Sequence, residues 1–169
     1  MKRLFAILLV VAMLLALAGC AGGETSSDNP SNNSNASVSS SDADPIRIGI
    51  WTSLTGASAI EGELIENGAR LAAAQWNAKG GINGRQIDFV VYDDQSTTEG
   101  AVTATTRLIE NDKVDAIIGS NLSNSIVATA SLIEEAGIPF VGSGTGTAWT
   151  KCGYHYIFRG TVVNSFMNE

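Results

Sequence analysis

Residues 114–141 read VDAIIGSNLSNSIVATASLIEEAGIPFV, and this stretch shows the pattern that decides the fold. Val114 to Ile118 is a short, continuous apolar run, which predicts a buried strand. Between Ser125 and Ala136 apolar residues recur with helical spacing, and Gly137 can adopt the left-handed conformation that ends a helix. A second apolar run, Ile138 to Val141, predicts another strand, so the stretch is one strand–helix–strand unit.

The same alternation continues on both sides of this unit. Further strands are predicted at Ile46–Trp51, Gln86–Tyr92 and Tyr154–Arg159, and further helices at Glu61–Lys79 and Thr97–Asn111. In the helix that begins at Glu61, the predicted buried face carries Ile65, Ala69, Ala72 and Trp76. Apolar strands that alternate with helices predict an α/β fold with a parallel, doubly wound, Rossmann-like sheet. In such sheets ligands bind at the carboxyl ends of the strands.

The first 44 residues predict export and anchoring. Lys2 and Arg3 precede an apolar run that is short for a membrane span, and Leu17-Ala18-Gly19 stands directly before Cys20. This pattern resembles the bacterial lipobox, so residues 1–19 are predicted to be a lipoprotein signal peptide and Cys20 to be lipidated. The alternative is an ordinary signal peptide or a transmembrane anchor with an incidental cysteine. Residues 21–44 are rich in Ser and Asn and contain no Lys or Arg, so residues 20–44 are predicted to form a disordered linker.

The composition limits the classes of partner. The formal net charge is −7, and it becomes −9 once Lys2 and Arg3 leave with the signal peptide, because 8 basic residues then face 17 acidic ones. A chain with this charge is a poor partner for nucleic acid or for an anionic lipid surface. With Cys20 lipidated only Cys152 remains, so no internal disulfide framework is expected. Residues 45–169 are long enough for one domain with a real core.

The residue patterns of common enzymes are missing. A dinucleotide site needs Gly-x-Gly-x-x-Gly after the first strand, but residues 52–56 read TSLTG, and the glycines that begin at Gly142 have the wrong spacing. No Gly-x-Ser-x-Gly elbow occurs, and His155, the only histidine, is poorly placed to activate Cys152. The carboxylates of Asp93-Asp94 are adjacent in a strand and therefore face opposite ways. We expect no catalytic residues, no metal site and no cofactor.

Residues 77–85, NAKGGINGR, resemble the signature of the branched-chain amino-acid-binding proteins of ABC importers, which have the type I periplasmic binding fold. Further pieces agree with that family in order and spacing: Leu54-Thr55-Gly56, Gly68-Ala69, Tyr92-Asp93-Asp94, Ile118-Gly119 with Ser123, Ile138-Pro139 and Phe158-Arg159. The resemblance covers Pro45 to Glu169 without interruption. Each piece is weak alone, whereas the ordered set is specific.

This resemblance implies two α/β lobes that are joined by hinge strands and close on a small ligand. Residues 45–169 resemble most of the first, N-terminal lobe, apparently truncated near the first hinge crossing. The implied function is that of an extracytoplasmic lipoprotein, anchored to a bacterial cell membrane, which captures an amino acid or a related small polar solute for an ABC permease without catalysis. The alternatives are a receptor for a sensory or signalling partner and, in a different class, an enzyme on a related α/β fold.

In that family the first lobe holds the polar head of the ligand. The matching positions here are Ser123, after the third strand, and Gly144-Thr145, after the fourth, although the loop of residues 142–147 fits the family only with a one-residue gap. Some relatives cover the ligand with an aromatic side chain near the position of Glu61, so Glu61 is a further candidate, and its charge argues against a leucine-like ligand. Some relatives also have a disulfide between the regions of Ser96 and Leu122, where this chain has no cysteine.

Each candidate also has a structural interpretation. Ser123 could be a helix N-cap, Thr145 a turn residue, and Glu61 a first-turn acid favoured by the helix dipole. Trp51 and Trp76 are expected to pack in the core, His155 is expected to be structural, and Trp149 is open between packing and a ligand or lobe contact.

Overall fold

The computed structural model of this chain describes residues 43–162. The predicted signal peptide and nearly all of the predicted linker lie outside these residues. The elements are β1 (Ile46–Thr52), α2 (Ala59–Asn77), β2 (Ile87–Asp93), α3 (Thr98–Arg107), the π-helical turn η2 (Leu108–Asp112), β3 (Ala116–Ile118), α4 (Ser123–Ala136), β4 (Phe140–Gly142), the 3-10 turn η3 (Ala148–Thr150) and β5 (Ile157–Arg159). Among the described helices, none has both the length and the apolar character to cross a bilayer.

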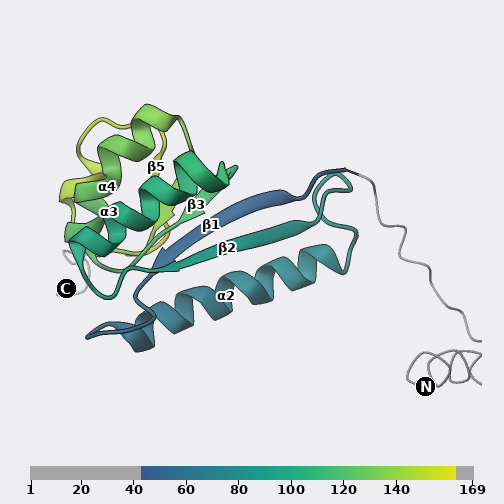
Figure 1. The fold of residues 1–169 in the computed structure, drawn as a ribbon, viewed down its shortest axis with the longest axis horizontal. Coiled ribbons are helices and arrows are strands. Elements are labelled where there is room, and N and C mark those ends of the chain that lie inside the picture. Colours follow the sequence, from purple (N-terminus) through teal and green to yellow (C-terminus); the bar gives the residue numbers. More distant parts are fainter. Residues whose placement is uncertain (1–42, 163–169) are drawn as a thin grey trace, which may run out of the picture. The chain divides into compact units, whose positions relative to one another are not determined.

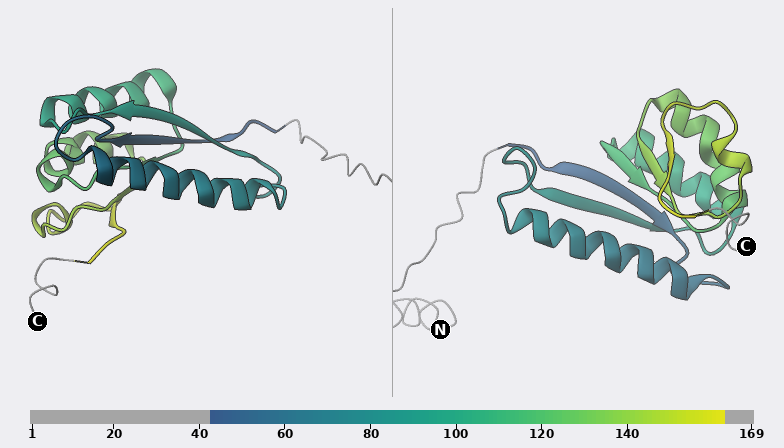
Figure 2. Two further views of the ribbon diagram at one scale, coloured as in Figure 1. Left: turned by 90° about the horizontal axis from the view of Figure 1, so that it is seen from below. Right: turned by 180° about the vertical axis from the view of Figure 1, so that it is seen from behind.

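The five strands form one parallel sheet in the order β2-β1-β3-β4-β5. Helix α2 covers β1 and β2 on one face, and α3 and α4 pack side by side on the opposite face (Figures 1 and 2). The predicted parallel, doubly wound α/β fold is therefore confirmed. The chain passes from β1 outward to β2 and then returns to β3 on the other side of β1, so the topological switch point lies between β1 and β3. Ligands of such sheets bind at the carboxyl ends of these two strands.

The main core lies between the sheet and the pair α3 and α4. Its largest members are wholly buried: Trp51, Leu108, Ile126, Ile133, Phe140 and Trp149. The rings of Trp51 and Phe140 stack with their centroids 5.8 Å apart. Trp51 thus packs as predicted. Trp149 also belongs to this core, so it does not present its ring to a ligand at the surface of the loop.

Helix α2 is rotated from the predicted phase by about one position at its C-terminal end. Its buried residues are Gly62 and Ala73, whereas Ala72 is exposed and Trp76 is 53% exposed. The expectation that Trp76 packs in the core is wrong. At this end of the helix Asn77 faces the sheet: its side chain donates to the carbonyl oxygen of Ile87 (2.9 Å) and accepts from the N–H of Ile87 (2.8 Å), which leaves Trp76 turned to solvent. At the start of the helix a β-carbon on Gly62 would lie only 1.8 Å from the carbonyl oxygen of Ser53, so only glycine permits that approach.

Two boundaries near the candidate site differ from the predicted ones, and one further helix ends in an unusual conformation. Helix α4 begins at Ser123, two residues earlier than expected, because the chain already turns at Ser120, whose hydroxyl oxygen accepts a hydrogen bond from the N–H of Leu122 (3.1 Å). β5 begins only at Ile157, so His155 precedes the strand. α3 continues into η2, which ends at Lys113 in the left-handed conformation without a glycine.

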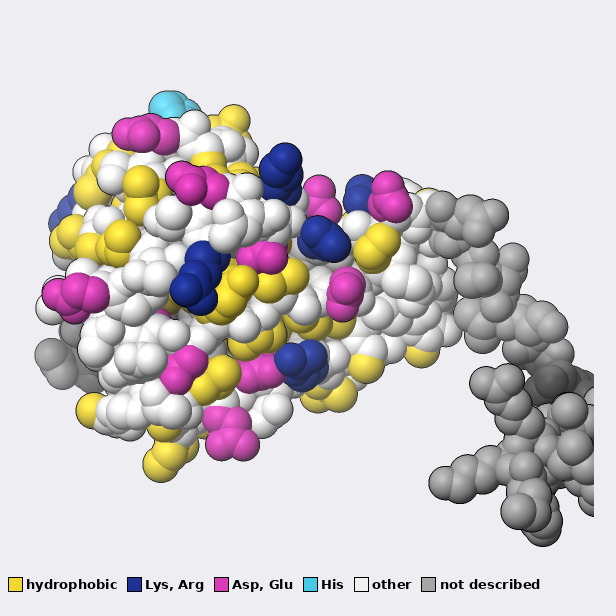
Figure 3. All heavy atoms as spheres, viewed as in Figure 1, with side chains coloured by type: hydrophobic (Ala, Val, Ile, Leu, Met, Phe, Trp, Pro, Cys, Tyr) yellow, Lys and Arg dark blue, Asp and Glu magenta, His cyan; other side chains and the backbone are white. Residues whose placement is uncertain are grey.

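The surface is mixed in charge. On the face shown in Figure 3, acidic and basic side chains lie interspersed with apolar ones, and no extended basic patch is visible there. That face lacks the cluster of Lys and Arg that a nucleic-acid-binding surface needs.

Candidate functional site

The loops at the carboxyl ends of β1 and β2 are bound together by Asp93. Its Oδ1 accepts hydrogen bonds from the backbone N–H groups of Leu54 (2.9 Å), Thr55 (3.2 Å) and Gln95 (2.8 Å), and its Oδ2 accepts one from the hydroxyl of Thr55 (2.6 Å). Burial alone would raise the pKa of Asp93, but the hydrogen bond from the Thr55 hydroxyl and those from the three N–H groups together hold that pKa below its usual value. The carboxylate therefore stays charged and fixes the first loop to the second.

Asp94 forms a separate set of contacts. It is buried, and its Oδ1 accepts hydrogen bonds from the hydroxyl of Ser53 (2.7 Å) and from the N–H of Ser96 (2.8 Å). The hydroxyl of Ser96 in turn donates to the carbonyl oxygen of Thr55 (2.9 Å). Asp93 and Asp94 thus turn to different partners, as their alternation along the strand predicts. Both carboxylates shape the edge of the sheet and do not converge on one point.

Ser123 stands in the first turn of α4, at the carboxyl end of β3. The N-cap residue is Leu122, which has no side-chain capping bond, so the interpretation of Ser123 as an N-cap is wrong. Its hydroxyl oxygen instead accepts a hydrogen bond from the N–H of Gly146 (2.9 Å), in the loop after β4. That bond leaves the hydroxyl proton able to donate to a ligand. The first-turn N–H groups of Ser123, Asn124 and Ser125 have no partner one turn earlier in the helix.

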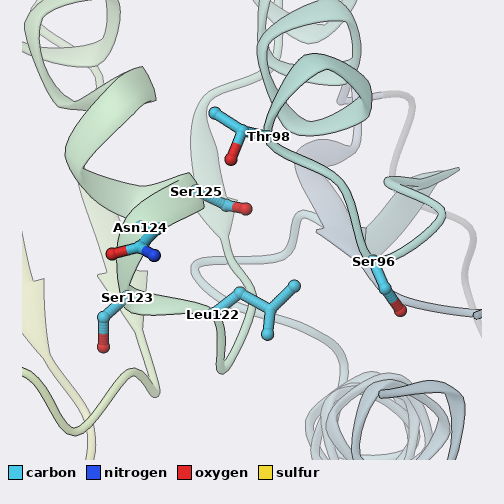
Figure 4. Close-up of a pocket in the computed structure, with 6 residues that line it drawn as sticks. All are labelled: Ser96, Thr98, Leu122, Ser123, Asn124 and Ser125. Atoms are coloured by element: carbon cyan, nitrogen blue, oxygen red, sulfur yellow. The ribbon is translucent and has the colours of Figure 1, made fainter. Parts of the chain in front are cut away.

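A hollow of about 270 Å³ opens beside this helix end (Figure 4). It is lined by Ser96, Thr98, Leu122, Ser123, Asn124 and Ser125. The first two come from the β2–α3 connection and the start of α3, and the other four from the start of α4. Five of the six lining residues carry a hydroxyl or amide group, so the hollow offers hydrogen-bonding partners to a small polar molecule. The regions of Ser96 and Leu122 do lie on opposite walls of one hollow.

The loop after β4 brings Gly144 and Thr145 next to Ser123. Gly144 is buried, and a β-carbon on it would lie 2.9 Å from both the hydroxyl oxygen of Ser123 and Cδ1 of Ile126. A side chain at this position would therefore push the loop away from α4. Thr145 is half-buried, and neither its N–H nor its hydroxyl has a hydrogen-bond partner among residues 43–162. The structure thus brings Ser123, Gly144 and Thr145 together at the edge where ligands of such sheets bind.

Glu61 is not part of this group. It is exposed in the first turn of α2 and does not line the hollow. That position matches the structural interpretation, an acid favoured by the N-terminal end of the helix dipole.

His155 is a structural residue with an exposed side chain. Its side chain is 85% exposed, and its backbone N–H donates to both carboxylate oxygens of Glu134 (3.0 Å each). The same carboxylate accepts from the N–H of Tyr156 (3.0 Å). The hydrogen bond from the His155 N–H is the largest of the contacts that hold the pKa of Glu134 below its usual value. Glu134 thereby ties the end of α4 to the segment that leads into β5.

Sequence reasoning gave no role to Arg159, which the structure places behind the β4 loop. Its Nη1 donates to the carbonyl oxygen of Gly144, and its Nη2 to that of Gly146. The guanidinium carbon lies 4.1 Å from the centroid of the Trp149 ring, and Nη2 also donates to the hydroxyl of Thr150 (3.2 Å). Burial lowers the pKa of Arg159 from its usual value. The only signal in the sequence was the Phe158-Arg159 pair, which matched the family without an assigned role.

Comparisons with known proteins agree with this geometry. The family model described as "Periplasmic binding protein" matches residues 45–166. The leucine-specific-binding protein of Salmonella typhimurium is 35% identical over 124 residues, which are 73% of this chain and 33% of that protein. The leucine-, isoleucine-, valine-, threonine-, and alanine-binding protein of Pseudomonas aeruginosa is 34% identical over 136 residues, covering 75% of this chain and 36% of that protein. The chain spans about a third of the length of the curated relatives it matches.

Solved structures show the same likeness. The branched-chain amino acid transporter substrate binding protein LivJ of Streptococcus pneumoniae, solved in complex with isoleucine, superposes with a TM-score of 0.69 at 37% identity, over 72% of this chain and 35% of that one. The leucine binding protein LivK of Thermotoga maritima superposes with a TM-score of 0.66 at 27% identity, over 72% of this chain and 34% of that one.

Proposed function

Because this chain belongs to the periplasmic binding protein family, in its type I, branched-chain amino-acid-binding group, we propose that it captures an amino acid or a similar small polar solute outside the cytoplasm for an ABC permease. Its relatives are solute-binding proteins and not enzymes, and we propose that this chain likewise performs no catalysis. We also propose that Cys20 carries a lipid that anchors the protein to a bacterial cell membrane, on its outer face or its periplasmic side.

One observation carries this proposal. Next to the switch point of the sheet, the first turn of α4 and the β4 loop meet at Ser123, whose hydroxyl oxygen accepts a hydrogen bond while its proton remains able to donate. Free N–H groups at the start of a helix attract an anion, and the helix dipole adds to that attraction. A carboxylate placed beside Ser123 would therefore find donors from α4, from Ser123 itself and from Thr145.

The mechanism follows from the placement of these donors on a rigid sheet. The ligand's polar head binds first to Ser123, Gly144 and Thr145, and a second lobe then closes over the ligand and buries it. Closure strengthens each hydrogen bond, because a bond made in water gains only about 0.5–1.5 kcal/mol net. The closed form is the one that the permease would recognise, since a ligand shifts the equilibrium only by binding the closed form more tightly.

Isothermal titration of the full-length protein against the twenty amino acids tests the proposal. We expect a micromolar or tighter dissociation constant for at least one of them, and branched-chain amino acids are the first to try. A protein that is folded by circular dichroism and gives no heat with any amino acid would contradict it. Genes for a permease and an ATPase beside this gene would support transport, whereas a neighbouring kinase gene would support a sensory receptor.

A further inference from the structure

We propose that Arg159 is the positioning residue of the ligand site: by holding the carbonyl oxygens of Gly144 and Gly146, it turns the N–H groups of the β4 loop toward the ligand and makes this lobe select a carboxylate. This inference deepens the proposed function and rests on it. Arg159 itself does not touch the ligand.

The geometry of the loop supplies the first step. Arg159 binds two carbonyl groups that are two residues apart, those of Gly144 and Gly146, through its two terminal nitrogens. The N–H of Gly146 is meanwhile bound by the hydroxyl oxygen of Ser123 (2.9 Å). The backbone at Gly146 is therefore gripped from both sides, by β5 through Arg159 and by α4 through Ser123.

The planarity of the peptide bond supplies the second step. In a trans peptide the C=O and the N–H point in opposite directions, and the described chain has no cis peptide. The carbonyl of Gly144 faces Arg159, so the N–H of Thr145 points away from it, and the same holds for the carbonyl of Gly146 and the N–H of Thr147. Neither N–H has an acceptor among residues 43–162. Both are donors without a partner on the side away from the guanidinium.

Charge supplies the third step. A carbonyl that accepts from a guanidinium is polarised, and in a chain of hydrogen bonds this makes the N–H of the same peptide a stronger donor. Two loop carbonyls that could have accepted from a ligand's ammonium group are occupied by Arg159. The N–H groups of Thr145 and Thr147 remain as donors, and together with the first turn of α4 they favour an anion.

The guanidinium is itself held in place. It lies over the wholly buried ring of Trp149, and its Nη2 donates to the hydroxyl of Thr150. Only arginine has a planar fork that can bind two carbonyls and stack on a ring at once, whereas lysine presents a compact point charge. Arg159→Lys keeps the charge and removes the fork, so it separates positioning from net charge.

The first arm of the test needs no ligand. Amide hydrogen exchange of Gly146 is measured in the full-length wild-type protein, in Arg159→Lys and in Arg107→Lys. Arg107 is a matched control because its guanidinium also lies over an aromatic ring, that of Tyr92 at 5.7 Å, but far from the β4 loop. We expect exchange at Gly146 to accelerate at least tenfold in Arg159→Lys only, while the sheet amide of Ile117, which donates to Pro139, is unchanged. Equal exchange at Gly146 in all three proteins would overturn the positioning role.

The second arm compares L-isoleucine with L-isoleucinamide, which lacks the carboxylate. If Arg159 acts on carboxylate donors, Arg159→Lys weakens L-isoleucine binding by about tenfold or more and leaves the weaker binding of the amide nearly unchanged. An equal loss for both compounds would overturn carboxylate selection. If the wild type binds neither, the comparison is repeated with the amino acid that binds in the titration of all twenty and with its amide. If none of the twenty binds, the carboxylate claim fails together with the proposed function, while the exchange measurement still decides the positioning role. Should Arg159→Lys not fold, Thr150→Val removes one guanidinium contact together with the hydroxyl's hydrogen bond to the carbonyl oxygen of Thr147 (3.3 Å), and it is expected to shift both measurements in the same direction by a smaller factor.

Discussion

Two glycines on the same helix should respond in opposite ways to the same substitution. Gly62 and Gly68 both lie in α2, but a β-carbon on Gly62 would meet the carbonyl oxygen of Ser53 at 1.8 Å, whereas a β-carbon on Gly68 has nothing within 4 Å. An ordinary contact between carbon and oxygen is about 3.3 Å, so Gly62→Ala must separate α2 from the first loop by about 1.5 Å. Gly68→Ala requires no movement.

The magnitudes follow from what can move. The first loop is held by the bond from the Ser53 hydroxyl to the buried Asp94 (2.7 Å), so it cannot withdraw without breaking that contact. Forced repacking of this kind costs about 1–3 kcal/mol, and the rigid backbone on both sides places Gly62→Ala at the upper end, even after the gain in helix propensity. Gly68→Ala should gain about 0.5–1 kcal/mol, because alanine loses less backbone entropy in a helix.

Urea unfolding of residues 43–169 followed by circular dichroism measures both effects, with the wild type as reference. We expect the urea midpoint to fall for Gly62→Ala and to rise for Gly68→Ala. In a separate thermal unfolding experiment the melting temperature of Gly68→Ala should rise by roughly 2–6 °C. A Gly62→Ala protein as stable as the wild type would refute the close approach of α2 to the first loop. A lower stability of Gly68→Ala would show that this side of the helix is not open.

Three further predictions concern the site and the anchor. Ser123→Ala removes the acceptor of the Gly146 N–H and a ligand donor, so it should lower stability by about 1 kcal/mol and amino-acid affinity by roughly 10- to 150-fold. The control Ser131→Ala, on the exposed side of α4, should change neither quantity. A Ser123→Ala protein that binds amino acids normally would contradict the candidate site. Asp93→Asn should destabilise the protein by about 1–3 kcal/mol at pH 7. Because folding lowers the pKa of Asp93, its charged carboxylate stabilises the fold above about pH 4, and this contribution is lost as the pH falls further. The difference in free energy of unfolding between Asp93→Asn and the wild type, measured with urea, should therefore shrink at about pH 3. Cys20→Ser should release the protein from the membrane fraction, and persistent membrane binding would count against lipidation.

The sequence predicted the fold because the fold depends on local patterns. Continuous apolar runs that alternate with helical spacing are sufficient to indicate parallel strands and covering helices, and all five predicted strands occur. The phase of α2 was wrong at Trp76, because it depends there on hydrogen bonds between Asn77 and Ile87 that no periodicity shows. The early start of α4 was missed for a similar reason, since it follows from a turn at Ser120.

Only part of the candidate site could be predicted. Ser123, Gly144 and Thr145 could be named as candidates because they follow strand ends and match positions in the family. The contacts that hold them could not, because Arg159 reaches back 15 residues to Gly144, across the pairing of β4 and β5. A sequence shows which residues are near a strand end, but not which carbonyl a guanidinium binds.

The loops at the carboxyl edge of the sheet form two groups, and hydrogen bonds join the loops within each group. Asp93 and Asp94 bind the β1 loop to the β2 loop, while Ser123 and Arg159 bind the start of α4 to the β4 loop. Among the described residues no hydrogen bond joins the two groups across the hollow between Ser96 and Leu122. That boundary coincides with the switch point between β1 and β3, where a ligand can enter without displacing a protein contact. A hollow with hydrogen-bonded walls and no bond across it is consistent with the proposed role in reversible solute binding.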